Sequence, residues 1–290
     1  MTHSVCIFAH NEEATLPRAV AALDAAAAGA SYVVHILENG STDGTALVAR
    51  ALAAADPRIT AHENAVADKT AAWNDYVHRI APEAEMHVFL DADSRPAPGA
   101  FKALALAFEG SPKAFAAAGL PAAGSSRLKW AQHLYTEHYL SGDLYALRGA
   151  AVARLRERNL RLPMGAVGED GILSYLLLTD LVGGEYDGWR ERIAIASGAF
   201  FEFDPLPISL TGAAQWRRRK TRAARRRFQH ELLFARLKRD GVRAMPDDIR
   251  ELYTEEALAQ LRPRLAPGHF VFDCLALLEI DPAAQEMGRS

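Results

Sequence analysis

The sequence has only two cysteines among its 290 residues, and Cys6 and Cys274 are not spaced like a disulfide framework or a thiolate metal site. Because Cys6 lies in an apolar run, we expect both thiols to be inert core groups in a reducing compartment. Long apolar runs are also lacking. The longest are residues 173–178 and 270–278, the second of which contains Asp273, and both are well below the roughly 18–20 residues of a membrane span. The sequence therefore favours neither a disulfide-rich secreted protein nor one that spans a membrane.

An export signal is not predicted either, because the apolar run at 5–9 is shorter than the hydrophobic region of such a signal. Repeats and low-complexity segments are absent apart from runs of alanine, which favour helix. Half of the residues are hydrophobic and 24% are charged, as in ordinary globular proteins. We expect a cytoplasmic protein, with peripheral contact to the inner face of a membrane as an open alternative.

Charge is unevenly distributed although the net charge is only -3. Residues 1–205 carry 17 basic and 25 acidic side chains, whereas residues 206–290 carry 16 and 11. Such a shift in sign predicts a boundary near residue 205. We therefore expect one domain over residues 1–205 and a basic helical extension over residues 206–290.

Short apolar runs alternate with helical patterns in the first half of the chain. The runs predict strands at 5–9, 32–37, 58–61 and 87–90, and the segments between and after them predict helices at 12–28, 44–55, 70–80 and 98–109. This alternation predicts an α/β fold with a mainly parallel sheet flanked by helices. Residues 113–200 are less regular, with a strand expected at 144–148 and a helix at 169–181. Residues from 213 onward read as helical, with a loop at 240–248.

Two carboxylates one residue apart, Asp91 and Asp93, follow the apolar run Met86–Leu90. Alternate side chains of a strand point to the same side, so both can face one ligand. Carboxylate oxygens hold hard divalent cations, and ligands of open α/β sheets bind beyond the carboxyl ends of the strands. The pair therefore suggests a cation site that holds a diphosphate, although carboxylates after a strand also serve as turn formers or helix caps.

Other polar segments also follow predicted strands or open predicted helices. The segment His10–Glu13 follows the first strand and Glu38–Thr45 the second, and both can contact a nucleotide or simply form caps and tight turns. Lys69 can neutralise a phosphate or remain a solvated surface lysine. Glu169 and Asp170 open a helix, where acids are favoured by the helix dipole but are also placed to act as a general base.

Taken together, these segments resemble the family 2 glycosyltransferases of the GT-A fold. Order and spacing agree over roughly residues 3–225, although Asn39 stands where the family usually has aspartate, and the segment at 215–219 only echoes the Gln-x-x-Arg-Trp motif of processive members. The motifs that carry the resemblance are His10–Glu13, Asn39–Thr45, Lys69–Asn74, Asp91–Ser94, Ser141–Arg148 and Gly168–Asp170.

The resemblance implies that a sugar passes from a nucleoside-diphosphate sugar, with UDP the expected nucleotide, to a hydroxyl of a glycan, lipid or small molecule, with inversion. It assigns Mg²⁺ or Mn²⁺ to Asp93 and the general base to Asp170, with Glu169 as the second catalytic candidate. The donor-nucleotide candidates are Ala9 through its backbone, Asn11, Glu13, Asn39, Lys69 and Asp91.

A dense basic segment follows, with eight cations among residues 217–227. It reads as a solvated helix, a contact to phosphate or lipid headgroups through residues 216–228, or a nucleic-acid patch. Sparse aromatic residues argue against single-stranded nucleic acid, so no nucleic-acid partner is expected. Within the enzyme, Trp216, Arg217 and Arg218 are candidates for diphosphate or acceptor contacts, and Arg219 could close over the donor diphosphate with the other two arginines.

Two other functions stay open. A nucleotidyltransferase that makes nucleotide sugars also uses a parallel sheet and metal carboxylates, but it needs a glycine-rich basic loop after the first strand, which is missing here. A non-catalytic basic-helix binding module is the second alternative. An apolar stripe at 270–280 indicates core packing or a homodimer contact.

Overall fold

The structure is a computed structural model that describes residues 2–185, 190–205 and 208–281. Within these residues one sheet is formed, with the strand order β3-β2-β1-β4-β7-β6-β8-β5. Its strands are β1 (His3–Ala9), β2 (Tyr32–Asn39), β3 (Ile59–Asn64), β4 (Met86–Asp91), β5 (Ser94–Pro96), β6 (Ala116–Pro121), β7 (Leu144–Arg148) and β8 (Ile193–Phe203).

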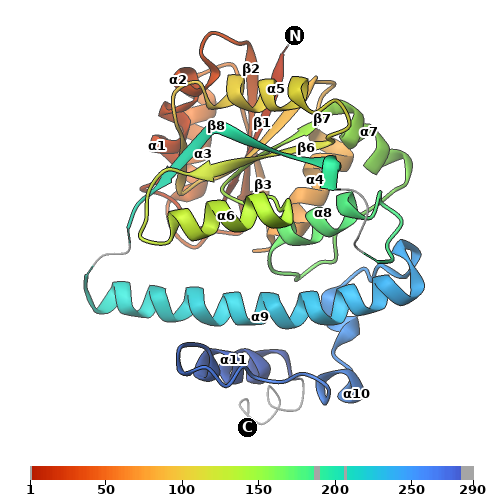
Figure 1. The fold of residues 1–290 in the computed structure, drawn as a ribbon. Helices are drawn as coiled ribbons and strands as arrows, with labels where there is room; N and C mark the ends of the chain where they lie inside the picture. Colours follow the sequence, from red (N-terminus) through yellow and green to blue (C-terminus); the bar gives the residue numbers. More distant parts are fainter. Residues whose placement is uncertain (1, 186–189, 206–207, 282–290) are drawn as a thin grey trace.

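Helices flank the sheet, and one long helix, α9, crosses below it (Figure 1). The α-helices are α1 (Leu16–Ala21), α2 (Leu23–Ala27), α3 (Thr45–Ala55), α4 (Lys69–Asp75), α5 (Ala100–Gly110), α6 (Arg127–Glu137), α7 (Gly149–Glu157), α8 (Glu169–Leu178), α9 (Leu210–Asp240), α10 (Glu255–Leu258) and α11 (Pro267–Ile280). The shorter helical turns are η1 (Tyr76–Ile80), η2 (Arg190–Arg192), η3 (Val242–Ala244) and η4 (Ile249–Leu252).

The α/β class is confirmed, but the expectation of a mainly parallel sheet is only partly right. β1 to β4 pair in parallel, as the alternation of strands and helices predicts. β7 then runs antiparallel to both β4 and β6, β6 is parallel to β8, and β5 is antiparallel to β8. The sheet is therefore mixed, because its second half is not built from strand-helix-strand units.

Two strands of the irregular middle segment were not expected. β6 has the sequence Ala-Ala-Ala-Gly-Leu-Pro, whose alanines read as helix filler rather than strand. Its small residues suit a central position, since a Cβ on Gly119 would lie 2.9 Å from a methyl carbon of Leu144. β8 carries apolar residues interrupted by Ser197 and Gly198. The helix expected at 12–28 is divided into α1 and α2.

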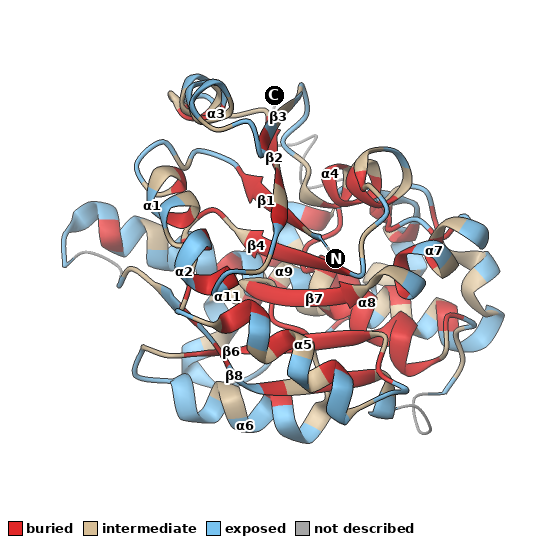
Figure 2. Ribbon diagram, turned by 90° about the horizontal axis from the view of Figure 1, so that it is seen from above, coloured by how far each residue is buried: buried red, intermediate tan, exposed pale blue. Residues whose placement is uncertain are grey.

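Each central strand contributes to two hydrophobic layers, one on each face of the sheet, and the core appears as a buried band along the strands (Figure 2). Along β4, Phe89 packs into one layer, whereas Val88 and Leu90 pack into the other. This division follows from the two-residue period of a strand. Phe89 stacks on Tyr145 of β7 with ring centroids 4.7 Å apart, which fixes the pairing of the two strands beside the polar residues at their ends.

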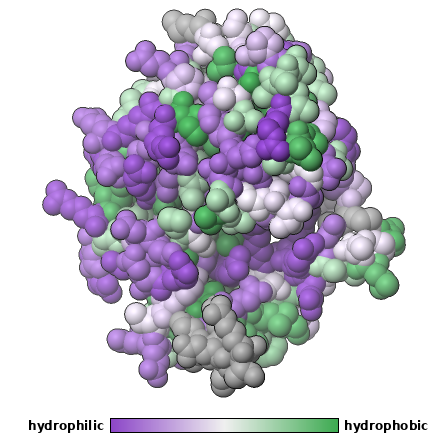
Figure 3. All heavy atoms as spheres, turned by 180° about the vertical axis from the view of Figure 1, so that it is seen from behind, coloured by the Kyte–Doolittle hydropathy of each residue, from purple (hydrophilic) through white to green (hydrophobic). Residues whose placement is uncertain are grey.

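The C-terminal part forms a layer beneath the sheet, in which α11 packs along α9 (Figure 1). Ala224 and Phe228 of α9 share a small core with Ala276 and Ile280 of α11. The face of the molecule opposite to that of Figure 1 is largely hydrophilic, with apolar atoms in small separate groups (Figure 3). Across the described ranges, no helix has both the length and the apolar character needed to cross a bilayer.

Candidate active site

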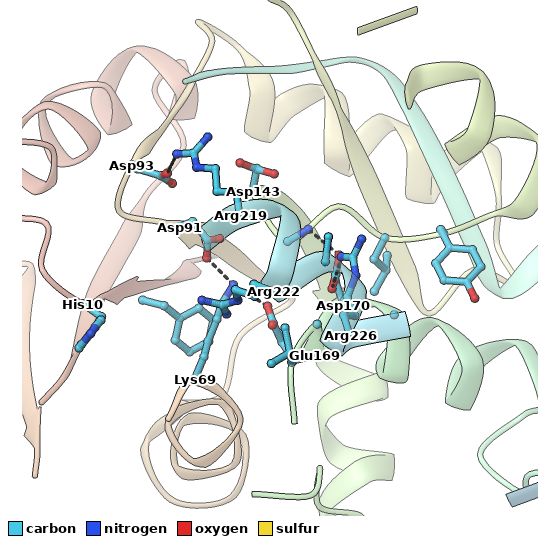
Figure 4. A pocket seen from close by; sticks show the side chains of 18 of the residues that line it. His10, Lys69, Asp91, Asp93, Asp143, Glu169, Asp170, Arg219, Arg222 and Arg226 are labelled. Carbon is cyan, nitrogen blue, oxygen red and sulfur yellow. Dashed lines mark hydrogen bonds and ion pairs between the residues drawn. The ribbon is translucent and has the colours of Figure 1, made fainter. Parts of the chain in front are cut away.

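A cavity of about 910 Å³ lies at the carboxyl ends of β1, β2 and β4, and α9 closes its lower side. Its polar side chains come from elements and loops that are far apart in the sequence, among them Lys69 of α4, Asp143 before β7 and Arg226 of α9 (Figure 4). The charged residues that line it are Glu12, Asp68, Lys69, Asp91, Asp93, Glu137, Asp143, Glu169, Asp170, Arg219, Arg222 and Arg226.

Three carboxylates gather at one end of this cavity. Oxygens of Asp91, Asp93 and Asp143 lie within 4.8 Å of one another. Asp91 ends β4, and Asp143 precedes β7, which pairs antiparallel to β4 with Leu90 opposite Leu144. Continuing that register by one residue brings Asp143 opposite Asp91. Asp143 was not among the predicted site residues, although it lies in the Ser141–Arg148 motif.

The electrostatics of this cluster are those of crowded, partly desolvated acids. Burial, followed by the charge of Asp93, raises the pKa of Asp143 to about 6. Burial also raises the pKa of Asp91 well above its usual value, although Lys69 acts in the opposite direction. Ser94 supports the cluster by donating a hydrogen bond of 2.8 Å to Asp143. A cation would relieve the repulsion among these acids.

Lys69 lies between two acidic groups instead of pointing freely into the cavity. Its Nζ is 2.5 Å from an oxygen of Asp91 and 2.6 Å from an oxygen of Glu169. Burial alone would lower the pKa of Lys69, but Asp91 and Glu169 raise it above its ordinary value. Glu169 is only 3% exposed, so Lys69 supplies the counter-charge that this buried carboxylate needs.

The start of α4 also holds the chain segment that leads to α8. Asp68 caps α4 through the backbone N–H groups of Thr70 and Ala71, and it accepts a further bond from Gly165 N–H at 2.7 Å. Asn74 donates to the carbonyl of Leu162 and accepts from its N–H, both at 2.8 Å. The Lys69–Asn74 motif therefore places the segment before Gly168 next to Lys69.

Asp170 is oriented toward the cavity from the first turn of α8. Its Oδ2 accepts a hydrogen bond of 3.2 Å from Gly142 N–H, beside Asp143. On its other side, Arg226 of α9 approaches Oδ1 to 3.9 Å. Asp93 and Asp170, which are 77 positions apart in the sequence, therefore face one cavity, as the predicted site requires.

Two glycines flank the acids Glu169 and Asp170 and let α9 come close. A Cβ on Gly168 would lie 2.2 Å from Cδ of Arg226, and a Cβ on Gly171 would lie 2.5 Å from Cε1 of His230. Gly168 also has a φ of +83°, which favours glycine. The Gly-Glu-Asp-Gly sequence thus combines acids at the cavity with space for the helix beneath them.

His230 and Gln229 fix this contact between α9 and the loop before α8. The Nε2 of His230 is 3.1 Å from the carbonyl oxygen of Val167, and Gln229 Oε1 accepts from Val167 N–H at 2.8 Å. Burial, followed by the charge of Arg226, lowers the pKa of His230 to about 4, so the ring is neutral near pH 7. Neither residue was predicted, because only their partners reveal their role.

The loops after β1 and β2 are bonded to each other at the rim. Asn11 does not cap the next helix, the alternative to its nucleotide role, because α1 begins at Leu16. Its side chain accepts a hydrogen bond from Thr42 N–H at 2.8 Å. Glu13 accepts from Gly44 N–H at 3.1 Å. These contacts join the two loops that were predicted to hold the nucleotide.

Two further candidates, Asn39 and Ala9, lie deeper in the fold, at the ends of β2 and β1. Asn39 is buried, lines the cavity, and receives the side-chain amide of Asn64 at 3.2 Å on its Oδ1. Ala9 is fully buried at the end of β1, between Phe8 and His10, which both line the cavity. The backbone of Ala9 is covered as well, so only its neighbours reach the surface of the cavity.

The three candidates from the basic segment do not line this cavity. Arg217 and Arg218 line a neighbouring groove beside the loop after β1, and Trp216 packs edge-on against Phe272 of α11 with ring centroids 5.1 Å apart. The arginines that do reach the cavity are Arg219, Arg222 and Arg226. Their spacing of three and four residues places them on one helical face, a signal that the sequence contains.

The family model described as glycosyl transferase family 2 matches residues 4–164. Among solved structures, the fold resembles the mannosyltransferase PcManGT from Pyrobaculum calidifontis in complex with GDP-Man and Mn²⁺, at a TM-score of 0.60 and 18% identity over 98% of this chain and 82% of that one. It also resembles TarS from S. aureus in complex with UDP-GlcNAc, at a TM-score of 0.53 and 13% identity over 99% and 92%.

At these identities the likeness concerns the fold, and it confirms the expected GT-A type. No curated protein sequence matches the chain. The family model covers more than half of the sequence and ends four residues before Gly168, so the chain belongs to glycosyl transferase family 2.

Proposed function

We propose that this protein is an inverting, metal-assisted hexosyltransferase that takes its sugar from a nucleoside-diphosphate sugar, with UDP as the expected nucleotide. The observation that carries the proposal is the convergence of Asp91, Asp93 and Asp143 within 4.8 Å, in the same cavity as Asp170. The two structural relatives named above were solved with a nucleotide sugar, which supports the same donor class here.

The donor set of the cluster suits Mg²⁺ or Mn²⁺. All three groups offer hard carboxylate oxygens, and these lie close together. Asp93 and Asp143 would hold the cation, with Asp91 between them and Lys69. When bound, a divalent cation neutralises the diphosphate that leaves the sugar.

Asp170 is proposed as the general base. The acceptor oxygen forms a bond to the anomeric carbon while the bond from that carbon to the diphosphate oxygen breaks, and the bonding electrons leave with the nucleoside diphosphate. Asp170 takes the hydroxyl proton as this occurs. Attack from the side opposite the diphosphate inverts the anomeric centre. The hydrogen bond from Gly142 N–H holds the Asp170 carboxylate in position for this transfer.

The remaining predicted residues are assigned to binding of the donor nucleotide or to the positioning of other side chains. Asn11 and Glu13 are proposed to frame the nucleotide at the joined loops, with Asn39 and Ala9 beneath it. Glu169 is proposed as a positioning residue rather than a base, because it is buried and holds Lys69. Lys69 in turn orients Asp91.

A thermal-shift experiment with UDP or GDP, each with and without Mn²⁺, tests the donor and metal assignments. We expect stabilisation by a nucleoside diphosphate only when Mn²⁺ is present, and its loss in Asp93→Ala. The variant Asp170→Asn should keep this stabilisation but lose transfer from the cognate nucleotide sugar. Normal turnover by Asp170→Asn would rule out the base assignment, and stabilisation by nucleotide alone would contradict the metal role.

The alternatives predict different readouts. A nucleotidyltransferase would release pyrophosphate from a nucleoside triphosphate and a sugar 1-phosphate, and a non-catalytic binding module would hydrolyse no nucleotide sugar from a panel. We expect slow, Mn²⁺-dependent hydrolysis of one sugar nucleotide instead. Four other expectations stay predictions. They are a glycan, lipid or small-molecule acceptor, peripheral membrane contact through residues 216–228, a cytoplasmic location and a homodimer through α11.

A further inference from the structure

Three arginines of α9 form a row along the lower side of the cavity. Arg219, Arg222 and Arg226 line it together and come from one face of the helix (Figure 4). The step from Arg222 to Arg226 is one turn, or roughly 6 Å along the helix axis. Two guanidinium groups one turn apart can therefore bind the same anion.

The row runs from the carboxylate cluster to the proposed base. At one end Arg219 lies 3.6 Å from Asp93, and at the other Arg226 lies 3.9 Å from Asp170. Charge-assisted N–H···O bonds are about 2.7–2.9 Å long, so neither contact uses up the guanidinium donors. Arg222, between them, forms no ion pair within the described part of the chain.

The position of Arg226 is fixed by packing rather than by its charge. Its aliphatic stem lies over Gly168, where a Cβ would collide with it. One turn further along α9, His230 and Gln229 bond to the backbone of Val167. The Arg226 side chain is nevertheless 48% exposed, so its head is held beside Asp170 and remains accessible to a ligand.

We propose that Arg222 and Arg226 bind a phosphate group of the acceptor, which makes this enzyme specific for phosphate-bearing acceptors. The inference rests on the proposed function, because it assigns Asp170 to the acceptor hydroxyl. Arginine pairs suit phosphate oxygens through their planar set of N–H donors. The phosphate belongs either to a soluble sugar or polyol phosphate or to a lipid headgroup.

The donor diphosphate is served by a different part of the row. Arg226 lies seven positions after Arg219, which is roughly 10 Å along the helix axis. Arg219 lies beside Asp93 and the cation site, whereas Arg226 lies beside the base. A leaving diphosphate held at the carboxylate cluster engages the first arginine and leaves Arg222 and Arg226 for the second substrate.

The test measures binding of phenyl phosphate by calorimetry to the full chain saturated with UDP or GDP and Mn²⁺. Arg222→Gln and Arg226→Gln should each weaken it by roughly tenfold or more. Arg239→Gln is the matched control, since Arg239 is exposed at the end of the same helix, and it should change binding by less than about twofold. A parallel arm measures co-sedimentation with phosphatidylcholine vesicles that contain phosphatidylglycerol.

The outcomes separate the possibilities. Loss of phenyl phosphate binding in the two variants supports a soluble acceptor, and loss of vesicle binding alone supports a lipid acceptor. The proposal is overturned if neither probe distinguishes these variants from Arg239→Gln, or if the variants lose nucleotide binding while phenyl phosphate binding is unchanged. Failure of the wild-type chain to bind any nucleoside diphosphate would instead refute the proposed function, since phenyl phosphate binding can be measured without nucleotide.

Discussion

Replacing Lys69 with methionine should destabilise the protein strongly. Methionine keeps most of the side-chain length but removes the charge that lies 2.5 Å from Asp91 and 2.6 Å from Glu169. At an effective dielectric constant near 20, each contact carries roughly 6 kcal/mol of gross attraction, most of which desolvation cancels. Breaking a buried ion pair on one side typically costs about 3–5 kcal/mol, and this range is the expected loss.

Urea unfolding followed by far-ultraviolet circular dichroism measures this loss. The matched control is Arg79→Met, since the Arg79 side chain is 73% exposed and pairs with Asp75 within one helical segment. That pair should contribute less than about 0.5 kcal/mol. The double variant Lys69→Met/Glu169→Gln should recover part of the lost stability, because it removes one of the two uncompensated carboxylates.

Two results would refute the reasoning. One is a loss below about 1 kcal/mol for Lys69→Met, which would mean that solvent already screens the acids. The other is a double variant as unstable as Lys69→Met alone, since it would show that the buried Glu169 charge is not the cause. Added Mn²⁺ should also stabilise Lys69→Met more than the wild type, because a cation can replace the missing charge.

Three further predictions concern the cation site, the glycine contact and a buried histidine. Asp143→Asn should weaken Mn²⁺ binding, measured by calorimetry, by roughly tenfold or more. Asp240→Asn is the control, since Asp240 is exposed. Unchanged Mn²⁺ affinity in Asp143→Asn would show that Asp143 does not hold the cation. Gly171→Ala places a Cβ 2.5 Å from the His230 ring and should lower the free energy of unfolding by about 1–3 kcal/mol. The loss should be smaller in a His230→Ala background. Equal losses in both backgrounds would contradict a collision with the ring. Burial, then the neighbouring Arg156, lowers the pKa of His87 from 6.5 to about 4. Between pH 6.5 and 4 the unfolded chain therefore binds a proton at His87 that the folded chain does not. The free energy of unfolding should fall over this range by at most about 3 kcal/mol. His87→Asn should flatten that slope in urea unfolding, and an unchanged slope would exclude this residue.

Features that depend on local sequence were predictable. The strand that ends in Asp91 follows from an apolar run and a turn, and the helix opening at Glu169 follows from glycine and acids before an apolar segment. The parallel half of the sheet follows from the alternation of strands and helices. The candidate site residues on these elements could therefore be selected without knowledge of the tertiary structure.

Features that depend on long-range pairing were not predictable. Asp143 joins the acidic cluster through the register of Leu90 with Leu144, and a pairing across 54 positions leaves no local trace. Lys69 was expected at a phosphate, but its position between two acids depends on where α4 and α8 meet. The arginine face of α9 is visible as a spacing, whereas its orientation toward the site depends on Gly168.

The close contact at Gly168 and Gly171 limits how this protein can be recombined with its relatives. A chimera that joins this sheet to the C-terminal helices of another transferase would inherit a helix shaped for different neighbours. Where that helix carries a bulkier residue opposite Gly168 or Gly171, the two halves would be held apart and the acids at 169–170 would face open solvent. Successful exchanges should therefore transfer the stretch from 165 to 171 together with α9, as one inherited unit.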